Sequence, residues 1–178
     1  MATLVLNDKD KFLLNMEGQD FSSEAKTFIK LRERALSRLS KLDFPTVKME
    51  DWKYTSVREI AKREFRPQSP VNLSAAEVKK HFIPQLDAIT LVFVNGFYQE
   101  KFSVVPEKLQ AGLIVKSLNE GKKKHLALVE PFLGAGENSP NLFFANMNAA
   151  FSQDGGFVHV AKDVVVEKPI QIIHLTDG

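Results

Sequence analysis

The stretch that decides the fold reads Val158-His-Val160-Ala-Lys-Asp-Val164-Val-Val166-Glu-Lys-Pro-Ile170-Gln-Ile172. Two columns of aliphatic residues repeat in it every six positions, one starting at Val158 and the other at Val160. This spacing is typical of a parallel β-solenoid, in which each rung buries its apolar row against the next rung. We interpret the segment as the first rungs of a truncated solenoid, and we expect this chain to be part of a longer protein. An edge hairpin with Pro169 in its turn is the alternative.

A β-hairpin is predicted upstream of these columns. Residues 89–94 are rich in β-branched and aromatic side chains, and Asn95-Gly96 follows directly. This dipeptide tolerates the positive φ angles of a type I′ turn, so residues 97–102 are predicted to return as the second strand.

The first part of the chain is predicted to be helical. Between residues 22 and 42, apolar side chains recur at three- and four-residue steps, and a further helix is predicted over 141–151. The opposite face of the first helix is basic and carries Lys26, Lys30, Arg32, Arg34 and Arg38. We take Lys26, Lys30, Arg34 and Arg38 as a candidate partner surface, with a solvated basic face as the alternative.

These patterns predict an α+β chain in two parts. Residues 1–88 form an N-terminal helical region, and residues 89–178 form a mixed α/β segment that leads into the solenoid. Because an unfinished solenoid exposes strand edges and apolar rungs, we also expect self-association through residues 157–175.

Composition narrows the class of function. The 178 residues include 24 Lys/Arg and 22 Asp/Glu, a formal net charge of +2, which disfavours binding of nucleic acid mainly through its phosphates. The chain has no cysteine, so disulfides, thiolate catalysis and Cys-ligated metal clusters are excluded within it. It lacks a signal-peptide pattern and a long apolar run, and we expect a soluble cytoplasmic protein.

No residue of the sequence is assigned to catalysis, to a cofactor or to a metal. The four histidines have no histidine or cysteine at the i+3 or i+4 position, which argues against a metal site. A phosphate-binding loop that ends in Lys-Ser or Lys-Thr is absent, so ATP hydrolysis is unsupported.

A motif rich in aromatic and charged residues follows the first helix. Its notable members are Pro45, Thr46, Glu50, Trp52, Lys53 and Tyr54. We interpret Trp52 and Tyr54 as structural anchors beside a proline-induced bend, with a ligand platform as the alternative.

At this motif the sequence resembles the SufB/SufD family of iron–sulfur cluster assembly proteins, and most closely its SufD branch. The run from Pro45-Thr46 to Glu50-Asp51-Trp52-Lys53-Tyr54-Thr55 matches a family signature, and Phe93-Val94-Asn95-Gly96 matches its strand-and-turn signature. Downstream, Asn148-Ala-Ala-Phe151, Asp154-Gly155 and Lys168-Pro169-Ile170 follow in the family's order. The resemblance covers nearly all of the chain from about residue 20.

The resemblance implies a non-catalytic scaffold subunit that joins SufB and the ATPase SufC to assemble iron–sulfur clusters. It also implies that the solenoid is a right-handed parallel β-helix. Family members are more than twice as long as this chain, so the regions that contact SufB and SufC, and the cluster or iron site, are expected beyond Gly178.

Two other classes of function remain open at this stage. The six-residue columns are also found in hexapeptide-repeat acyltransferases, although those enzymes use more rungs and a histidine at a subunit interface. The basic helix could instead belong to a module that binds a protein or a nucleic acid.

Overall fold

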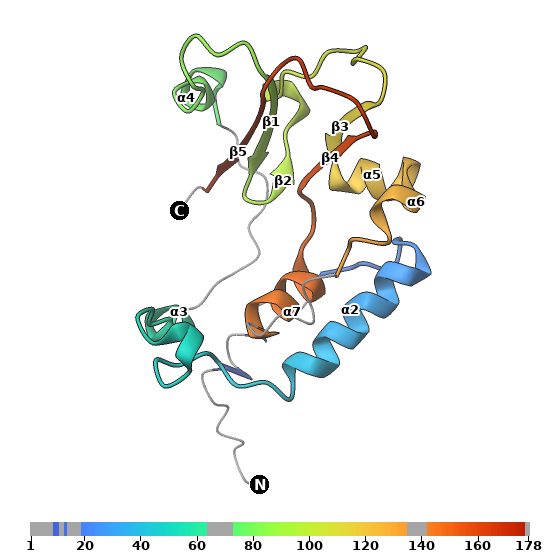
Figure 1. Cartoon of the computed structure of the whole chain (residues 1–178). Coiled ribbons are helices and arrows are strands. Elements are labelled where there is room, and N and C mark those ends of the chain that lie inside the picture. Colours follow the sequence, from blue (N-terminus) through green and yellow to red (C-terminus); the bar gives the residue numbers. More distant parts are fainter. Residues whose placement is uncertain (1–8, 11–12, 14–18, 64–72, 135–141, 177–178) are drawn as a thin grey trace, which may run out of the picture. The chain divides into compact units, whose positions relative to one another are not determined.

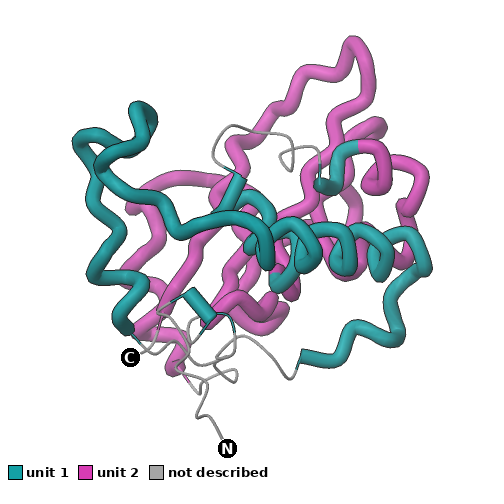
Figure 2. Tube along the Cα trace, turned by 90° about the horizontal axis from the view of Figure 1, so that it is seen from below, with its two compact units in different colours: residues 1–67, 132–151 teal, residues 68–131, 152–178 magenta. Residues whose placement is uncertain are grey.

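The computed structural model describes residues 9–10, 13, 19–63, 73–134 and 142–176 (Figure 1). The chain divides into two compact units, coloured separately in Figure 2. Unit 1 comprises residues 1–67 and 132–151, and unit 2 comprises residues 68–131 and 152–178. The boundary predicted from the sequence lies between residues 88 and 89, whereas the structure assigns 68–88 to the unit of the strands and 132–151 to the unit of the first helix.

Unit 1 is helical in its described part. Its elements are α2 (Lys26–Leu39), a 3-10 turn (Glu50–Trp52), α3 (Arg58–Ala61) and α7 (Leu142–Phe151). The apolar face of α2 packs against α7, and the shared core contains Ala35, Leu39, Phe143 and Ala150. Lys9 donates to the carbonyls of Ser40 and Leu42 at 3.2 and 3.0 Å, which places a cation at the negative end of α2.

Helix α2 is shorter than the predicted 22–42. Its first helical residue is Lys26, because the backbone of Ala25 is still extended, with φ −60° and ψ 143°; the Ser22 amide bonds to the Asp20 carboxylate at 2.9 Å in a turn before it. Its last is Leu39, and Pro45 follows as a buried residue. The helix predicted over 141–151 corresponds to α7, and Asn141 lies outside the described residues.

The described part of unit 2 contains two small sheets and three α-helices. Its elements are α4 (Ala75–Lys79), β1 (Ile89–Val94), β2 (Phe97–Tyr98), a 3-10 turn (Glu100–Phe102), β3 (Leu113–Ser117), α5 (Leu118–Lys124), α6 (Leu126–Val129), β4 (Gly156–Val160) and β5 (Ile170–Leu175). One sheet has the order β2-β1-β5, and the other pairs β3 with β4.

The predicted hairpin is confirmed, with a shorter second strand. β1 and β2 pair antiparallel around Asn95 and Gly96, whose φ angles are 51° and 85°. The return strand ends at Tyr98, because a 3-10 turn begins at Glu100 and Ser103 bonds back to the hairpin. There the Ser103 hydroxyl accepts from the Val92 amide at 3.0 Å and donates to the Gln99 carbonyl at 2.8 Å.

Strand β5 pairs with β1 in parallel over its whole length, from Ile89 opposite Ile170 to Val94 opposite Leu175. The connection from β4 to β5 is held by polar contacts. The Gln110 side chain donates to the Val165 carbonyl at 2.6 Å and accepts from the Glu167 amide at 3.1 Å. Lys168 bonds to both carboxylate oxygens of Asp87 at 2.9 and 2.7 Å.

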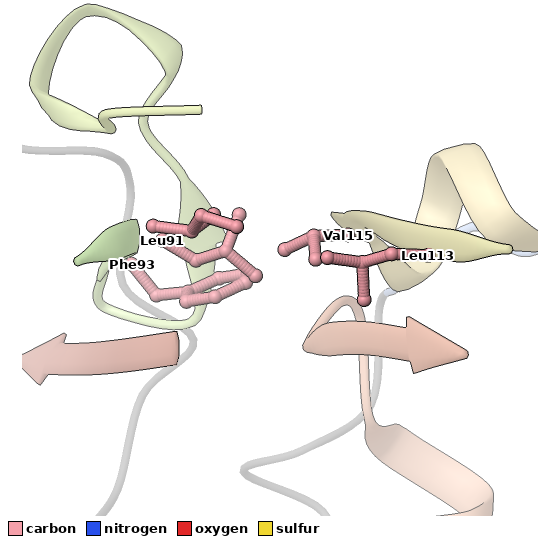
Figure 3. Packing of buried hydrophobic residues seen from close by; sticks show 5 residues of the cluster. Leu91, Phe93, Leu113 and Val115 are labelled. Atoms are coloured by element: carbon pink, nitrogen blue, oxygen red, sulfur yellow. The ribbon is translucent and has the colours of Figure 1, made fainter. Parts of the chain in front are cut away.

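The two sheets of unit 2 face each other across an apolar core. Leu91 and Phe93 of β1 point toward Leu113 and Val115 of β3 (Figure 3). Helix α4 covers the other face of the first sheet, where Val78 meets Val92, Val94 and Ile173. The resulting order of layers is α4, the sheet of β1, and the sheet of β3.

Candidate partner-binding surfaces

The aromatic motif of unit 1 folds as a series of tight turns. The amides of Met49, Trp52 and Thr55 donate to the carbonyls of Thr46, Met49 and Trp52 at 2.9, 3.0 and 2.9 Å. These turns place the Trp52 ring on Phe144 of α7, with ring centroids 5.5 Å apart. The ring centroid of Phe44 lies 4.7 Å from that of Phe143 and 5.6 Å from that of Phe144, so Phe44, just before the motif, and Trp52 within it contact one aromatic cluster.

The structure separates the two anchors that the sequence analysis had grouped. Trp52 is half-buried on α7 and therefore fixes the motif within unit 1. Tyr54 is 92% exposed, and its ring has Lys53 Nζ 5.6 Å from its centroid. Tyr54 therefore does not share the half-buried position of Trp52, and its role as a structural anchor stays a prediction. Thr46, Glu50 and Lys53 are exposed as well.

A buried ion pair in unit 1 was missed by the sequence analysis, which had placed Arg32 on the basic face. Arg32 is 6% exposed and bonds to both carboxylate oxygens of Glu24 at 2.7 and 2.9 Å. It also donates to the Ala150 carbonyl at 2.9 Å, and its guanidinium lies 3.4 Å from the centroid of the Phe21 ring. The available signal was its spacing, because Arg32 stands four residues after the buried Phe28.

The other predicted cations of α2 lie away from the core. Lys26, Lys30 and Arg34 are exposed and Arg38 is half-buried, and we call these four residues the basic face. They follow one another at four-residue steps, so they form one row along the helix. The structure thus brings the four residues of the candidate partner surface together on one side of α2.

A second surface lies at the open end of the core in unit 2. Val158 and Val160 of β4 pair with Val115 and Leu113, so their side chains face the space between the sheets. Ile172 of β5 pairs with Leu91 and faces the same space. Yet Val158, Val160 and Ile172 are 39%, 40% and 43% exposed, because in the described part of the chain β4 and β5 each pair on one side only. We call these three residues the open end.

The open end shows how the six-residue columns are arranged. Val158 and Ile170 stand on different sheets, so residues twelve apart in the sequence face each other across the core and do not stack in one sheet. A Cβ built on Gly156 would lie 2.9 Å from the Ile172 side chain, which shows how closely β4 approaches β5. The column residues of β4 and β5 therefore face the space between the two sheets. Their stacking as successive rungs of a solenoid stays a prediction.

Among the described residues, no group of three or more His, Asp or Glu side chains is placed to hold a metal ion. Two of the four histidines lie against aromatic rings: the His174 ring stacks on Phe93 with centroids 4.9 Å apart, and the His125 ring centroid lies 6.0 Å from that of Phe157. No helix in the described part combines the length and apolarity needed to cross a membrane.

Charge pairing shifts the pKa of one acidic group in unit 2. A hydrogen bond from Lys124, together with Lys116, lowers the pKa of Glu120. The Lys124 and Lys116 ammonium groups lie 2.8 and 3.3 Å from Glu120 Oε1. These ion pairs link the end of β3 to the exposed side of α5.

Comparison with known proteins identifies the family of this chain. The model of the SufBD protein N-terminal region matches residues 14–172. An iron–sulfur cluster assembly SufBD family protein of Synechocystis sp. is 24% identical over 169 residues, which are 95% of this chain. The chain spans 37% of the length of that relative. Since the family model matches most of the chain, this protein belongs to the SufBD family, whose N-terminal region it contains.

Proposed function

We propose that this chain is the N-terminal region of a SufD-like scaffold subunit that works in the cytoplasm in Suf-type iron–sulfur cluster assembly. The observation that carries the proposal is the match of the SufBD N-terminal model over residues 14–172. The Synechocystis relative, which bears iron–sulfur cluster assembly in its name, supports it. The motif around Trp52 and the Asn95-Gly96 hairpin, which carry the resemblance to SufD, support the choice of subunit.

The proposed role is to hold partner subunits and not to catalyse a reaction. We propose a SufB-like subunit and a SufC-like ATPase as the partners, and we expect them to bind regions that correspond to the part of the relative's length that this chain does not span. The cluster is the product of the assembly, and we propose that its site also lies outside residues 1–178. Residues 1–178 then contribute structure and contact surface.

We further propose that β4 and β5 are the first strands of a right-handed parallel β-helix. Two features support this fold. The parallel pairing of β1 with β5 is the strand arrangement of a β-helix, and the open end leaves inward-facing aliphatic side chains for a following turn to cover. Hydrogen exchange tests the proposal: amides of β4 and β5 that exchange quickly in this chain are expected to be protected in the full-length parent. Equal exchange in both proteins would contradict it.

Co-purification tests the scaffold role. Two tagged baits, this chain and its full-length parent, are expressed in the source cells, and retained proteins are identified by mass spectrometry. The parent is expected to retain SufB-like and SufC-like proteins, and this chain is expected to retain neither. If the parent retains neither protein, the proposed function is wrong; if the short bait retains them, the contacts lie within residues 1–178.

A further inference from the structure

Helix α7 is apolar on all sides except at two asparagines. Eight of its ten residues are Leu, Phe, Ala or Met, and the other two are Asn146 and Asn148. One side of the helix packs against α2, and another carries Phe144, which contacts the rings of Phe44 and Trp52. A helix that is apolar all round is typical of a core, so a polar side chain buried along it calls for an explanation.

Asn146 is such a side chain, and one of its two polar atoms has no hydrogen-bond partner. It is 0% exposed and lies on the same side of α7 as Phe143 and Ala150, three residues after the one and four before the other. Phe143 and Ala150 belong to the core that α7 shares with α2. The Asn146 Nδ2 donates to the Leu142 carbonyl at 2.7 Å, whereas its Oδ1 accepts no hydrogen bond. An unpaired buried acceptor keeps the full cost of its desolvation.

The desolvation cost at Asn146 disappears when α7 leaves α2. Water then reaches the Oδ1 atom, so the cost applies only to the packed state and favours separation of the two helices. An alanine at this position would carry no such cost, and it has a higher helix propensity than asparagine. Asn146 therefore makes the contact between α2 and α7 less stable than an apolar residue would.

The connectivity of the chain allows this contact to open by itself. The segment that contains α7, residues 132–151, is inserted between two stretches of unit 2, whereas α2 belongs to residues 1–67. Parting α2 from α7 breaks none of the strand pairs β1–β2, β1–β5 and β3–β4. A polar link that it does break is the bond from Arg32 to the Ala150 carbonyl. Proteins commonly open in such cooperative units before they unfold globally.

We propose that α7 separates from α2 in a local opening that leaves unit 2 folded, and that Asn146 sets how often this opening occurs. Unit 1 then has a packed form and an open form. The side of α2 that holds Leu31, Ala35 and Leu39 is buried in the packed form and accessible only in the open one. A partner that binds this side binds more weakly in proportion to the rarity of the open form. This inference does not depend on the proposed role in cluster assembly.

Native-state hydrogen exchange of the whole chain measures the opening. Amides of α2 and α7 are expected to share one level of protection, at least about tenfold below that of β1, which is paired on both sides. Low concentrations of urea should accelerate exchange in α2 and α7 together, because one event exposes both helices. Protection of α2 and α7 equal to that of β1 would overturn the proposal, since unit 1 would then open only when the whole chain unfolds.

The second asparagine of α7 supplies the matched control. Asn146→Ala is expected to lower the open population about tenfold or more. Asn148→Ala, at an exposed position with the same gain in helix propensity, should lower it about threefold or less. Asn146→Val repeats the test with a side chain that leaves less space behind. Equal effects of alanine at the two positions contradict the proposal. So does more frequent opening in both Asn146 variants, which would mean that a bound donor such as a water molecule satisfies Oδ1.

Discussion

Arg32 joins three parts of unit 1 through a single guanidinium group. It contacts the Phe21 ring before α2, both carboxylate oxygens of Glu24, and the carbonyl of Ala150 near the end of α7. The side chains of Arg32 and Glu24 are only 8% and 14% exposed, so their ion pair is shielded from water. Removing one member of such a buried ion pair strongly destabilises the fold, because the remaining charge is still shielded from water and has lost its partner.

Replacing Arg32 by Met is therefore expected to destabilise the protein by about 3–5 kcal/mol. The free energy of unfolding from urea titration at neutral pH measures the effect. Lys62→Met is the control, since its bridge to Glu59 is exposed at 45% and 77%, and its loss should amount to about 1 kcal/mol or less. Similar losses in the two variants would show that Arg32 does not hold the unit together.

The lowered pKa of Glu120 predicts a pH-dependent contribution to stability. Because Lys124 and Lys116 favour its ionised form, the folded pKa lies below the usual 4.5. The stabilisation is then present above that value and is lost as pH falls through the folded pKa. Glu120→Gln should reduce stability by about 1 kcal/mol or less at neutral pH and make no difference at pH about 2.

Urea titrations of both proteins across this pH range measure the difference, and Glu107→Gln, at an exposed site, is the control. A stability difference that persists unchanged into acid would mean that the Glu120 carboxylate does not act through its charge.

Gly96 and Gly112 both lie in turns, but a side chain added at the two positions would have different neighbours. Gly96 has φ +85° and open space around a Cβ, whereas Gly112 has φ +80° with Val164 Cγ2 at 2.7 Å and the Ala161 Cβ at 3.1 Å. Gly96→Ala is expected to cost about 1–2 kcal/mol from backbone strain alone. Gly112→Ala adds the cost of overpacking, about 1–3 kcal/mol more. Thermal and urea unfolding of both variants test this order, and an equal loss would contradict the packing at Gly112.

The type of a secondary-structure element could be predicted where a short sequence motif determines it. Asn95-Gly96 set the hairpin, because this dipeptide takes up the positive φ angles that the turn requires. The signal failed where a competing local bond intervened, as at Ser22, whose amide bonds to Asp20 before α2 begins. The exposure of Tyr54 was not predictable either, because the direction of a side chain within a series of tight turns is not encoded in its spacing from Trp52.

At the scale of the whole chain, the sequence did not predict which distant segments share a core. Residues 132–151 join the N-terminal helix because Phe143 and Ala150 complete its apolar face, and no periodic signal links segments a hundred residues apart. The aliphatic columns predicted which side chains of β4 and β5 face inward. They could not show that β4 pairs antiparallel with β3, since strand partners depend on the topology of unit 2.

The open end predicts that this chain associates with itself. Among the described strands, β4 and β5 each leave one edge unpaired beside half-exposed aliphatic side chains, and this forms a surface onto which another strand can add. Sedimentation velocity over a range of concentrations should show a monomer in equilibrium with larger species.

The double variant Val158→Lys/Ile172→Lys tests where that association occurs. Lysine on the inner side of an edge strand places a charge where a partner strand would pack, so the dissociation constant should rise about tenfold or more. Leu36→Lys/Ile60→Lys adds the same charge at exposed sites of unit 1, and it should leave association unchanged. If the control variant weakens association as much, net charge and not the open end drives it. A wild-type chain that stays monomeric at high concentration would show that the edges of β4 and β5 do not pair with a second copy.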